Sequence, residues 1–319
     1  MWARTSLPNF SPEPFDVVVH DLSKVLPWQL HRASRVPTVA IVRHVNGRLL
    51  MREAPVLTGP AFWAAERFYR FAYGRTPIVT EALATRKTLV DLGLPSGSIR
   101  IVRPGVDHGT FYPEPSKKTT VPEILFVGRL KPYKSADLAI GALKLLRQHV
   151  PRAHLTIAGR GPERDRLERF AERMGLEDAV TFAGFVSADR LAELYRQSWV
   201  HVQPSVVEGW GLTAIEAAAC GTPTVAYRAG ALVESVGPLS APFLTEERTS
   251  AALAGTLERC ISALSNDPNC MSEGLTEYAR SFDWDQTAGS YERILMDVAS
   301  TWAHGEPAAV GSALPAFAH

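Results

Sequence analysis

The sequence predicts an α/β protein with two domains that each contain a parallel sheet. Three observations support this. The chain has 319 residues, the length of two ordinary domains. Short β-rich runs alternate with helical patterns along it, which favours parallel strands joined by crossover helices. Hydrophobic residues make up 46% of the chain and charged residues 21%, a composition typical of soluble globular proteins.

Bulk properties exclude several function classes. The net charge is only +1, which does not indicate a protein that binds nucleic acid. The three cysteines form no C-x-x-C pair or Cys/His cluster with metal-ligand spacing, so we expect no metal site and a reducing, cytoplasmic location. No apolar run approaches the roughly 20 residues that span a bilayer. Residues 1–14 lack the pattern of a secretory signal.

The predicted first domain covers residues 1–111. Its β-rich runs lie at residues 16–19, 38–42, 77–79 and 98–102, and its helical patterns lie at 61–73 and 81–92. Residues 112–123 follow as a predicted linker, because they are rich in Pro, Ser, Thr and Lys and have no apolar periodicity.

The second domain is predicted at residues 124–285 and has the pattern of a complete Rossmann-like unit. Five strands are expected, each followed by a helical pattern, at residues 124–127, 154–158, 179–182, 199–203 and 222–226. A final helix is expected over 286–302. Residues 303–319 are rich in Ala, Gly and Pro, which predicts a disordered tail.

The stretch 203–230, QPSVVEGWGLTAIEAAACGTPTVAYRAG, carries the strongest chemical signal. A strand is followed by a glycine-containing loop and a helix from Leu212 to Cys220. Glycines let backbone N–H groups approach an anion and a helix N-terminus adds a positive dipole, so a diphosphate suits this turn. Glu208 and Glu216 can address one ligand, Glu216 at ribose hydroxyls and Glu208 at the sugar. Taken singly, each acid is more simply a capping or solvated helix acid.

A second loop, FVGRLKPYKSAD at residues 126–137, contributes basic groups. Arg129 and Lys134 lie between a predicted strand and a predicted helix, where they suit phosphate oxygens. The run that starts at Gly128 is one residue away from the P-loop pattern G-x-x-x-x-G-K-[ST]. Tyr133 takes the place of the second glycine, and its β-carbon would obstruct the phosphate cradle. No apolar strand ending in Asp supplies a magnesium ligand, so we reject a P-loop.

Two further motifs are weaker. AGRGPERD at residues 158–165 opens like G-x-G-x-x-G, but Arg164 replaces the third glycine and no acid follows on a strand end at the expected distance. This disfavours a nicotinamide-dependent dehydrogenase. Asp283-Trp284-Asp285 has the D-x-D form of some metal-dependent transferases. Because it immediately precedes a helical run, we interpret Asp285 as an N-cap.

Two histidines of the first domain are candidate ligand contacts. His20 and His44 each follow a predicted strand, at the carboxyl end where ligands bind in an open α/β sheet. An ordinary loop histidine is the competing interpretation for each. The aromatic, arginine-rich helix at 61–75 can contact a membrane or an amphiphilic acceptor. Core packing is the commoner fate of such aromatics.

Together these residues resemble the retaining glycosyltransferases of family 4, which have the two-domain GT-B fold. The resemblance covers about residues 15–301. Its strongest motif is E-x7-E, from Glu208 to Glu216. The supporting matches are VGRLKPYKSADLAI, IAGRGPERDRLE, VTFAGFV, IRIVRPGVDHGTFYP and FDWDQTAGSYERIL. The last of these is similar to the helix that crosses back to the first domain.

The resemblance implies a role for each matched position. Arg129 and Lys134 would bind the donor diphosphate, Glu216 the ribose, and Glu208 the donor sugar near the reacting carbon. His20 or His44 would lie on the acceptor side. The backbone around Phe185 and Val186 would contact the base, and Gly209, Gly211 and the helix start at Leu212 would face the phosphates. The other donor-site residues would be Gly128, Gly161, Trp210 and Thr213.

The implied reaction moves a sugar from a nucleotide-diphosphate sugar, such as a UDP- or GDP-sugar, with retention of configuration and without a metal or cofactor. The acceptor would be a carbohydrate, a lipid or a small molecule. Peripheral contact with the inner membrane face is compatible with this reaction.

The resemblance also implies that the first domain is incomplete, because the family normally begins with a further strand–loop–helix portion. Two function classes therefore stay open. One is an active glycosyltransferase. The other is a non-catalytic nucleotide-sugar-binding protein, or a subunit that a complementing chain completes. An epimerase or phosphorylase of the same fold fits the E-x7-E loop less well.

Overall fold

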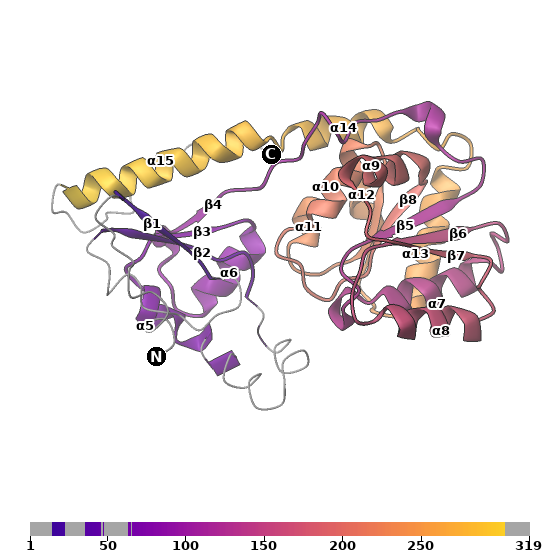
Figure 1. The fold of residues 1–319 in the computed structure, drawn as a ribbon, viewed down its shortest axis with the longest axis horizontal. Coiled ribbons are helices and arrows are strands. Elements are labelled where there is room, and N and C mark those ends of the chain that lie inside the picture. The colour runs from indigo at the N-terminus through magenta and orange to yellow at the C-terminus, as the bar shows by residue number, and fades with distance from the viewer. Residues whose placement is uncertain (1–14, 23–35, 46, 48–62, 65, 304–319) are drawn as a thin grey trace. The chain divides into compact units, whose positions relative to one another are not determined.

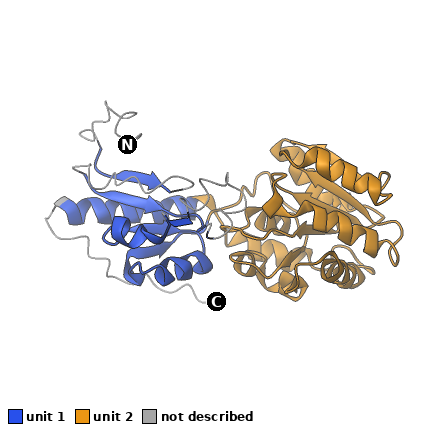
Figure 2. Cartoon of the chain, turned by 90° about the horizontal axis from the view of Figure 1, so that it is seen from below, with its two compact units in different colours: residues 1–103, 285–319 blue, residues 104–284 orange. Residues whose placement is uncertain are grey.

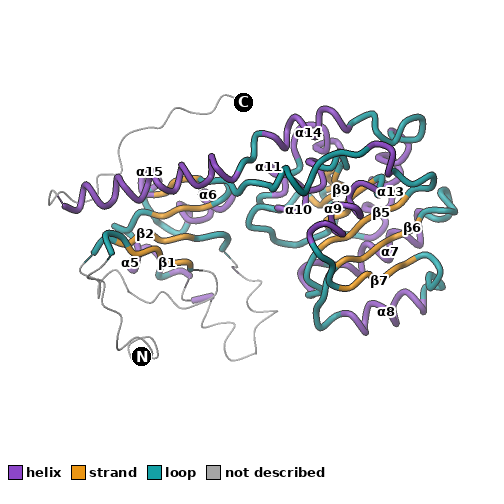
Figure 3. The backbone as a smooth tube through the Cα atoms, turned by 45° about the horizontal axis from the view of Figure 1, so that its top comes forward, coloured by secondary structure: helices purple, strands orange, loops and turns teal. Residues whose placement is uncertain are grey.

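The computed structural model describes residues 15–22, 36–45, 47, 63–64 and 66–303 (Figure 1). Contacts within the chain divide it into two compact units, residues 1–103 with 285–319 and residues 104–284 (Figure 2). Each unit contains one parallel sheet flanked by helices (Figure 3). This confirms the α/β class with two parallel sheets that the sequence predicts. The predicted tail lies outside the described residues from 304 onward.

The first unit has a parallel sheet in the order β1-β2-β3-β4. Its strands are β1 (Val18–Asp21), β2 (Thr38–Ile41), β3 (Ile78–Thr80) and β4 (Ile99–Ile101). Its helices are α5 (Tyr69–Tyr73), α6 (Leu83–Asp91) and α15 (Trp284–Ala303), with a 3-10 turn η2 (Ser96–Ser98).

Both faces of this sheet are covered, as a parallel sheet requires. Adjacent residues of β2 show the alternation, since Val39 packs toward α15 and Ala40 packs toward α5 and α6. Ile294 and Val298 of α15 are buried against the first face. Figure 1 shows α15 on one side of the sheet, with α5 and α6 on the other.

The second unit has a six-stranded parallel sheet in the order β10-β9-β8-β5-β6-β7. The strands are β5 (Glu123–Val127), β6 (His154–Ala158), β7 (Val180–Gly184), β8 (Val200–Gln203), β9 (Thr224–Tyr227) and β10 (Leu244–Thr245). The prediction of five strands was one short, because β10 is only two residues long and leaves no periodic signal.

Helices cover both faces of the second sheet. They are α7 (Ala136–Leu146), α8 (Arg164–Arg173), α9 (Ala188–Gln197), α10 (Leu212–Ala219), α11 (Leu232–Ser235), α12 (Gly237–Ser240), α13 (Ser250–Ala263) and α14 (Ser272–Arg280). Helices α7, α8 and α13 share the main apolar core with the strands. Helix α10 packs against α9 and α14.

The strand order creates a topological switch point between β5 and β8. The chain leaves β5 toward β6 on one side and leaves β8 toward β9 on the other. At such a point the loops after the two strands diverge, which leaves a crevice outside the carboxyl ends of the strands where ligands bind in open α/β sheets. The loop with Arg129 and Lys134 follows β5, and the loop with Glu208 follows β8.

Two local predictions need correction. His20 lies inside β1 rather than after it, because the strand is displaced by two residues from the predicted 16–19. Asp285 lies in the first turn of α15, which begins at Trp284, so it is not the N-cap. Among the described residues, no helix is both long and apolar enough to cross a membrane.

The glycines of AGRGPERD bring two loops into contact. A Cβ on Gly159 would lie 1.8 Å from the Gly128 carbonyl oxygen, and one on Gly161 would lie 2.1 Å from the Leu130 carbonyl oxygen. A backbone hydrogen bond joins the same two loops, since the Leu130 N–H donates to the Arg160 carbonyl over 2.9 Å. The structure therefore requires glycine at these positions for close backbone packing.

We expect Gly161→Ala to destabilise the second unit, because the added methyl group would overlap the Leu130 backbone. Overpacking of this kind costs about 1–3 kcal/mol or more. The measurement is the free energy of unfolding from urea denaturation.

Gly255→Ala is the matched control, since Gly255 lies within α13 and a Cβ there meets nothing within 4 Å. We expect this control to stabilise the chain by about 0.5–1 kcal/mol. Equal effects of the two substitutions would contradict the packing argument.

Candidate functional site

The loop after β5 is shaped by a short 3-10 helix, η4 (Pro132–Lys134), that delivers Lys134 to the switch point. Ser135 follows with a φ of +53° and starts α7. A left-handed conformation at a non-glycine residue costs roughly 1–2 kcal/mol, so the surrounding structure must hold it in place. The Val206 N–H of the other loop donates to the Tyr133 carbonyl over 2.8 Å. The two loops are therefore joined by backbone as well as by side chains.

Lys134 and Glu208 meet at the switch point. Lys134 Nζ lies 2.5 Å from Glu208 Oε1, and the side chains are only 14% and 12% exposed. Gln203, the last residue of β8, donates from Nε2 to the same carboxylate oxygen over 3.0 Å. The fold thus brings together two predicted site residues that are 74 positions apart in the chain. Their opposite charges compensate one another.

Arg129, the other predicted base, lies on the exposed side of the same loop. Its Nη2 donates to the Tyr133 hydroxyl over 2.7 Å. The ammonium of Lys134 lies 5.3 Å from the centre of the Tyr133 ring. Tyr133, which argued against a P-loop, therefore connects the two bases and presents them side by side.

Glu216 lies in the second turn of α10, where the Tyr195 hydroxyl donates to its Oε2 over 3.0 Å. Burial raises the pKa of Glu216 to about 7, and the Tyr195 hydrogen bond partly opposes this rise. His201 of β8 packs edge-on against the Tyr195 ring. Burial lowers the pKa of His201 to about 3, which keeps it neutral.

The start of α10 is tightly packed. Gly211 has a φ of +97°, and a Cβ there would lie 2.7 Å from Ser235 Oγ and 2.8 Å from Leu232 Cδ2. Glycine is therefore favoured here both by the positive φ and by the lack of space for a Cβ. Trp210 is buried against Phe282, with the ring centres 5.5 Å apart. Leu212 and Thr213 then begin the helix, and Gly209 is half-buried beside them.

Several buried polar atoms near this helix start have no hydrogen-bond partner in the described structure. They are Gln203 Oε1, Ser205 Oγ, Thr213 Oγ1 and Ser235 Oγ. Buried polar groups are nearly always paired in native proteins, so a cluster of unpaired ones is a feature of ligand sites. Sequence reasoning missed Gln203, Ser205 and Ser235, because common polar residues within a strand or a short helix give no pattern.

Phe185 and Val186 follow β7. Phe185 is 71% exposed, and the guanidinium of Arg160 lies 5.3 Å from its ring centre. Gly128 begins the loop after β5, where its N–H donates to the Ala158 carbonyl over 3.0 Å. The role predicted for Gly161 in donor binding stays a prediction, and its contact with Leu130 gives it a packing role.

In the first unit, the predicted His20 is buried. Its Nδ1 lies 3.2 Å from the Tyr73 hydroxyl. The next residue, Asp21, faces the other way and accepts from Arg43 Nε over 3.2 Å. Arg43 Nη1 also donates to Glu81 over 2.7 Å. These three residues stand at the carboxyl ends of β1, β2 and β3, where sequence reasoning had placed His20 and His44.

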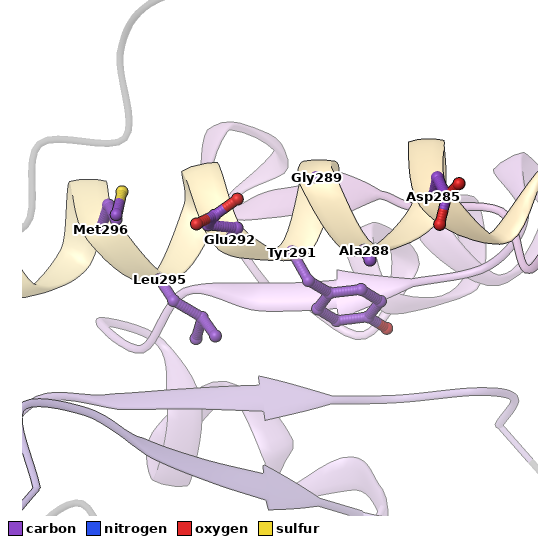
Figure 4. A pocket seen from close by; sticks show the side chains of 7 residues that line it. All are labelled: Asp285, Ala288, Gly289, Tyr291, Glu292, Leu295 and Met296. Carbon is purple, nitrogen blue, oxygen red and sulfur yellow. The ribbon is translucent and has the colours of Figure 1, made fainter.

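An open groove also runs along α15 in the first unit (Figure 4). Tyr291 and Leu295 extend from the helix toward the sheet, while the ends of the groove carry acidic and thioether side chains. It is lined by Asp285, Ala288, Gly289, Tyr291, Glu292, Leu295 and Met296, none of which is a predicted site residue. Within the described ranges, no group of three His, Cys, Asp or Glu side chains is arranged to hold a metal ion.

We expect Glu216→Gln to stabilise the protein increasingly as the pH rises from about 4.5 to 7. The unfolded carboxyl ionises at its ordinary pKa near 4.5, whereas the folded one holds its proton until about pH 7. The wild type therefore loses stability over this range, by at most about 3 kcal/mol, and the amide does not. Thermal denaturation of both proteins between pH 4 and pH 9 measures the difference.

Glu277→Gln is the control for this experiment, because the Glu277 side chain is 72% exposed. Exposed ion pairs contribute little to stability, so its effect should be small at every pH. A constant offset between Glu216→Gln and the wild type would refute the raised pKa.

Comparison with known proteins places this geometry in a family. The family described as Glycosyl transferases group 1 matches residues 109–281, which is more than half of the chain. A D-inositol 3-phosphate glycosyltransferase of Acidothermus cellulolyticus is 36% identical over 282 residues, covering 81% of this chain and 58% of the relative. A protein of the same name from Mycolicibacterium smegmatis is 32% identical over 229 residues, covering 66% of this chain and 50% of the relative. The chain therefore spans about half the length of these curated relatives.

Solved structures share the fold. HepE from Anabaena in complex with UDP and glucose has a TM-score of 0.72 at 20% identity, covering 88% of this chain and 78% of that one. Sucrose-phosphate synthase from Thermosynechococcus elongatus has a TM-score of 0.76 at 22% identity, covering 94% and 77%. At these identities the likeness concerns the fold alone. The family match and the shared fold confirm what the E-x7-E motif predicts: the chain belongs to the group 1 glycosyl transferases and has a GT-B-like fold.

Proposed function

We propose that this chain binds a UDP-sugar at the switch point of its second unit and transfers the sugar to a polyol acceptor with retention of configuration. The contact between Lys134 and Glu208 carries the proposal, because it joins a phosphate-binding base and a sugar-binding acid at the place where an open α/β sheet takes its ligand. The N-terminus of α10 adds a positive dipole beside them.

The donor would exchange partners with this ion pair. Its diphosphate takes over Lys134 and Arg129, which frees the Glu208 carboxylate for hydroxyls of the sugar. Gln203 stays bonded to Glu208 and keeps it in place. Because the pair is only 14% and 12% exposed, the incoming charges meet with little screening by water.

In the transfer step, the bond from the anomeric carbon to the β-phosphate oxygen breaks and a bond to the acceptor oxygen forms on the same face of the sugar. The acceptor proton passes to the departing phosphate oxygen. Lys134 and Arg129 stabilise the negative charge that develops on the diphosphate, and the dipole of α10 adds to this stabilisation. No residue of this chain needs to form a covalent bond with the sugar.

The choice of UDP is supported by the structural neighbours. HepE is described with UDP, with UDP-glucose, and with UDP and glucose. The Phe185–Val186 segment is assigned to the base by resemblance, and the exposed ring of Phe185 is accessible for stacking.

For the acceptor, we propose the cluster of Asp21, Arg43 and Glu81. It offers a half-exposed guanidinium between two carboxylates, a set of fixed donors and acceptors that suits vicinal hydroxyls. The first two relatives compared above act, by their names, on inositol 3-phosphate. Since the cluster carries two negative charges and one positive, it suits the polyol ring rather than the phosphate.

A non-catalytic nucleotide-sugar-binding protein, or a subunit completed by another chain, is the alternative. Both functions require donor binding, and only the first requires transfer.

We expect calorimetric titration to give micromolar binding of UDP, weaker binding of GDP and ADP, and no change with EDTA. Arg129→Ala should weaken UDP binding about tenfold or more, because a charge-assisted hydrogen bond contributes about 1.5–3 kcal/mol. Glu208→Ala should leave UDP binding nearly unchanged and abolish transfer from UDP-glucose.

Arg152→Ala is the matched control for Arg129→Ala, since Arg152 is exposed in the turn before β6, at the opposite end of the strands. If the folded wild type binds none of the three nucleotides, both the transferase and the non-catalytic binding function are excluded. Binding without transfer would favour the non-catalytic alternative.

We expect Arg43→Met to raise the KM for inositol or inositol 3-phosphate about tenfold or more, because the two carboxylates lose their common partner. The dissociation constant for UDP should stay within twofold of the wild type. Steady-state transfer from UDP-glucose and calorimetry measure the two quantities.

Lys87→Met is the control, since it removes an exposed charge of α6 whose ion-pair partner in the described part of the chain is Asp91. An unchanged acceptor KM in Arg43→Met would exclude the cluster as the acceptor site.

A further inference from the structure

We propose that Tyr195 is a positioning residue of the donor site, whose hydroxyl holds the Glu216 carboxylate in the orientation that receives the donor ribose. The inference rests on the proposed function, because it takes Glu216 to be a ribose ligand. Tyr195 itself touches no donor atom and acts through Glu216.

The Tyr195 side chain is immobilised by its surroundings. It is completely buried, and its ring packs edge-on against Phe111 and His201 with centre distances of 6.1 and 5.7 Å. The backbone is anchored as well, since the Thr222 hydroxyl donates to the Tyr195 carbonyl over 2.7 Å. A ring held on both sides leaves its hydroxyl in one place.

The hydroxyl meets only one of the two oxygens of Glu216. Tyr195 Oη donates to Oε2 over 3.0 Å, and Oε1 has no protein partner among the described residues. Glu216 is half-buried on α10, so its side chain is partly accessible to a ligand. Two adjacent ribose hydroxyls need a carboxylate of fixed orientation, which the hydrogen bond from Tyr195 supplies.

The same bond favours the ionised form of Glu216. The groups that face this carboxylate in the described structure are Tyr195 from α9 and Cys220 from its own helix, with neutral His201 behind the Tyr195 ring. Burial raises the pKa of Glu216 to about 7 although the hydrogen bond from Tyr195 lowers it, so without the hydroxyl the pKa would be higher still and the carboxyl mostly protonated at neutral pH. A protonated carboxyl accepts hydrogen bonds from ribose less well.

The test is calorimetric titration of the folded chain with UDP from pH 6 to pH 9. We expect Tyr195→Phe to weaken UDP binding about tenfold at pH 7 and to move the midpoint of the pH profile upward. The loss should shrink toward pH 9, where Glu216 is ionised in both proteins. In a Glu216→Gln background the same substitution should no longer move the pH profile, because the titrating carboxyl is gone.

Tyr227→Phe is the matched control. Tyr227 is equally buried in the same unit, and its hydroxyl donates to the Thr249 carbonyl over 3.1 Å, on a different element. We expect its UDP affinity to stay within twofold of the wild type, with an unmoved pH profile.

The outcomes separate this inference from the proposed function. If Glu216→Ala loses UDP binding while Tyr195→Phe keeps it at every pH, the positioning role is overturned and the donor site stands. If Tyr195→Phe gives the same pH-dependent loss in the Glu216→Gln background, the tyrosine does not act through the Glu216 carboxyl and the inference is also overturned. If the folded wild type does not bind UDP, the proposed function itself fails.

Discussion

The pairing of β5 with β8 is the constraint on which the donor site depends. Strand β5 begins the second sheet, and its neighbours β6 and β8 lead the chain away in opposite directions. The loops after β5 and β8 therefore lie side by side, and Lys134 of the first loop contacts Glu208 of the second. A different strand order with the same local sequences would leave the base and the acid apart, since neither loop contains both.

Several groups of the site lower the stability of the folded state. Glu216 is half-buried with its pKa raised, Ser135 has a left-handed backbone, and polar atoms such as Ser205 Oγ are buried without a partner among the described residues. Each of these opposes folding, and the apolar core on the opposite face of the sheet offsets them. Such an arrangement is typical of a preformed ligand site, where the ligand supplies the missing partners.

In the first unit, the strand register decides which side chains are available. A displacement of β1 by two residues places His20 in the buried layer and Asp21 at the exposed edge, because side chains alternate along a strand. Asp21 then joins Arg43 and Glu81 from the neighbouring strands. The polar cluster at this edge of the sheet is therefore a product of register rather than of any motif.

The sequence by itself determined the alternation of strands and helices, the two loops with Arg129, Lys134 and Glu208, and the family, because these signals are local in the chain. The tertiary structure alone decided which oxygen of Glu208 meets Lys134, that Gly161 serves backbone packing, and that Asp21 replaces His20 at the strand ends. It also brought Tyr195 to Glu216. These contacts join residues about 20 to 74 positions apart or depend on strand register, and local periodicity carries no information on either.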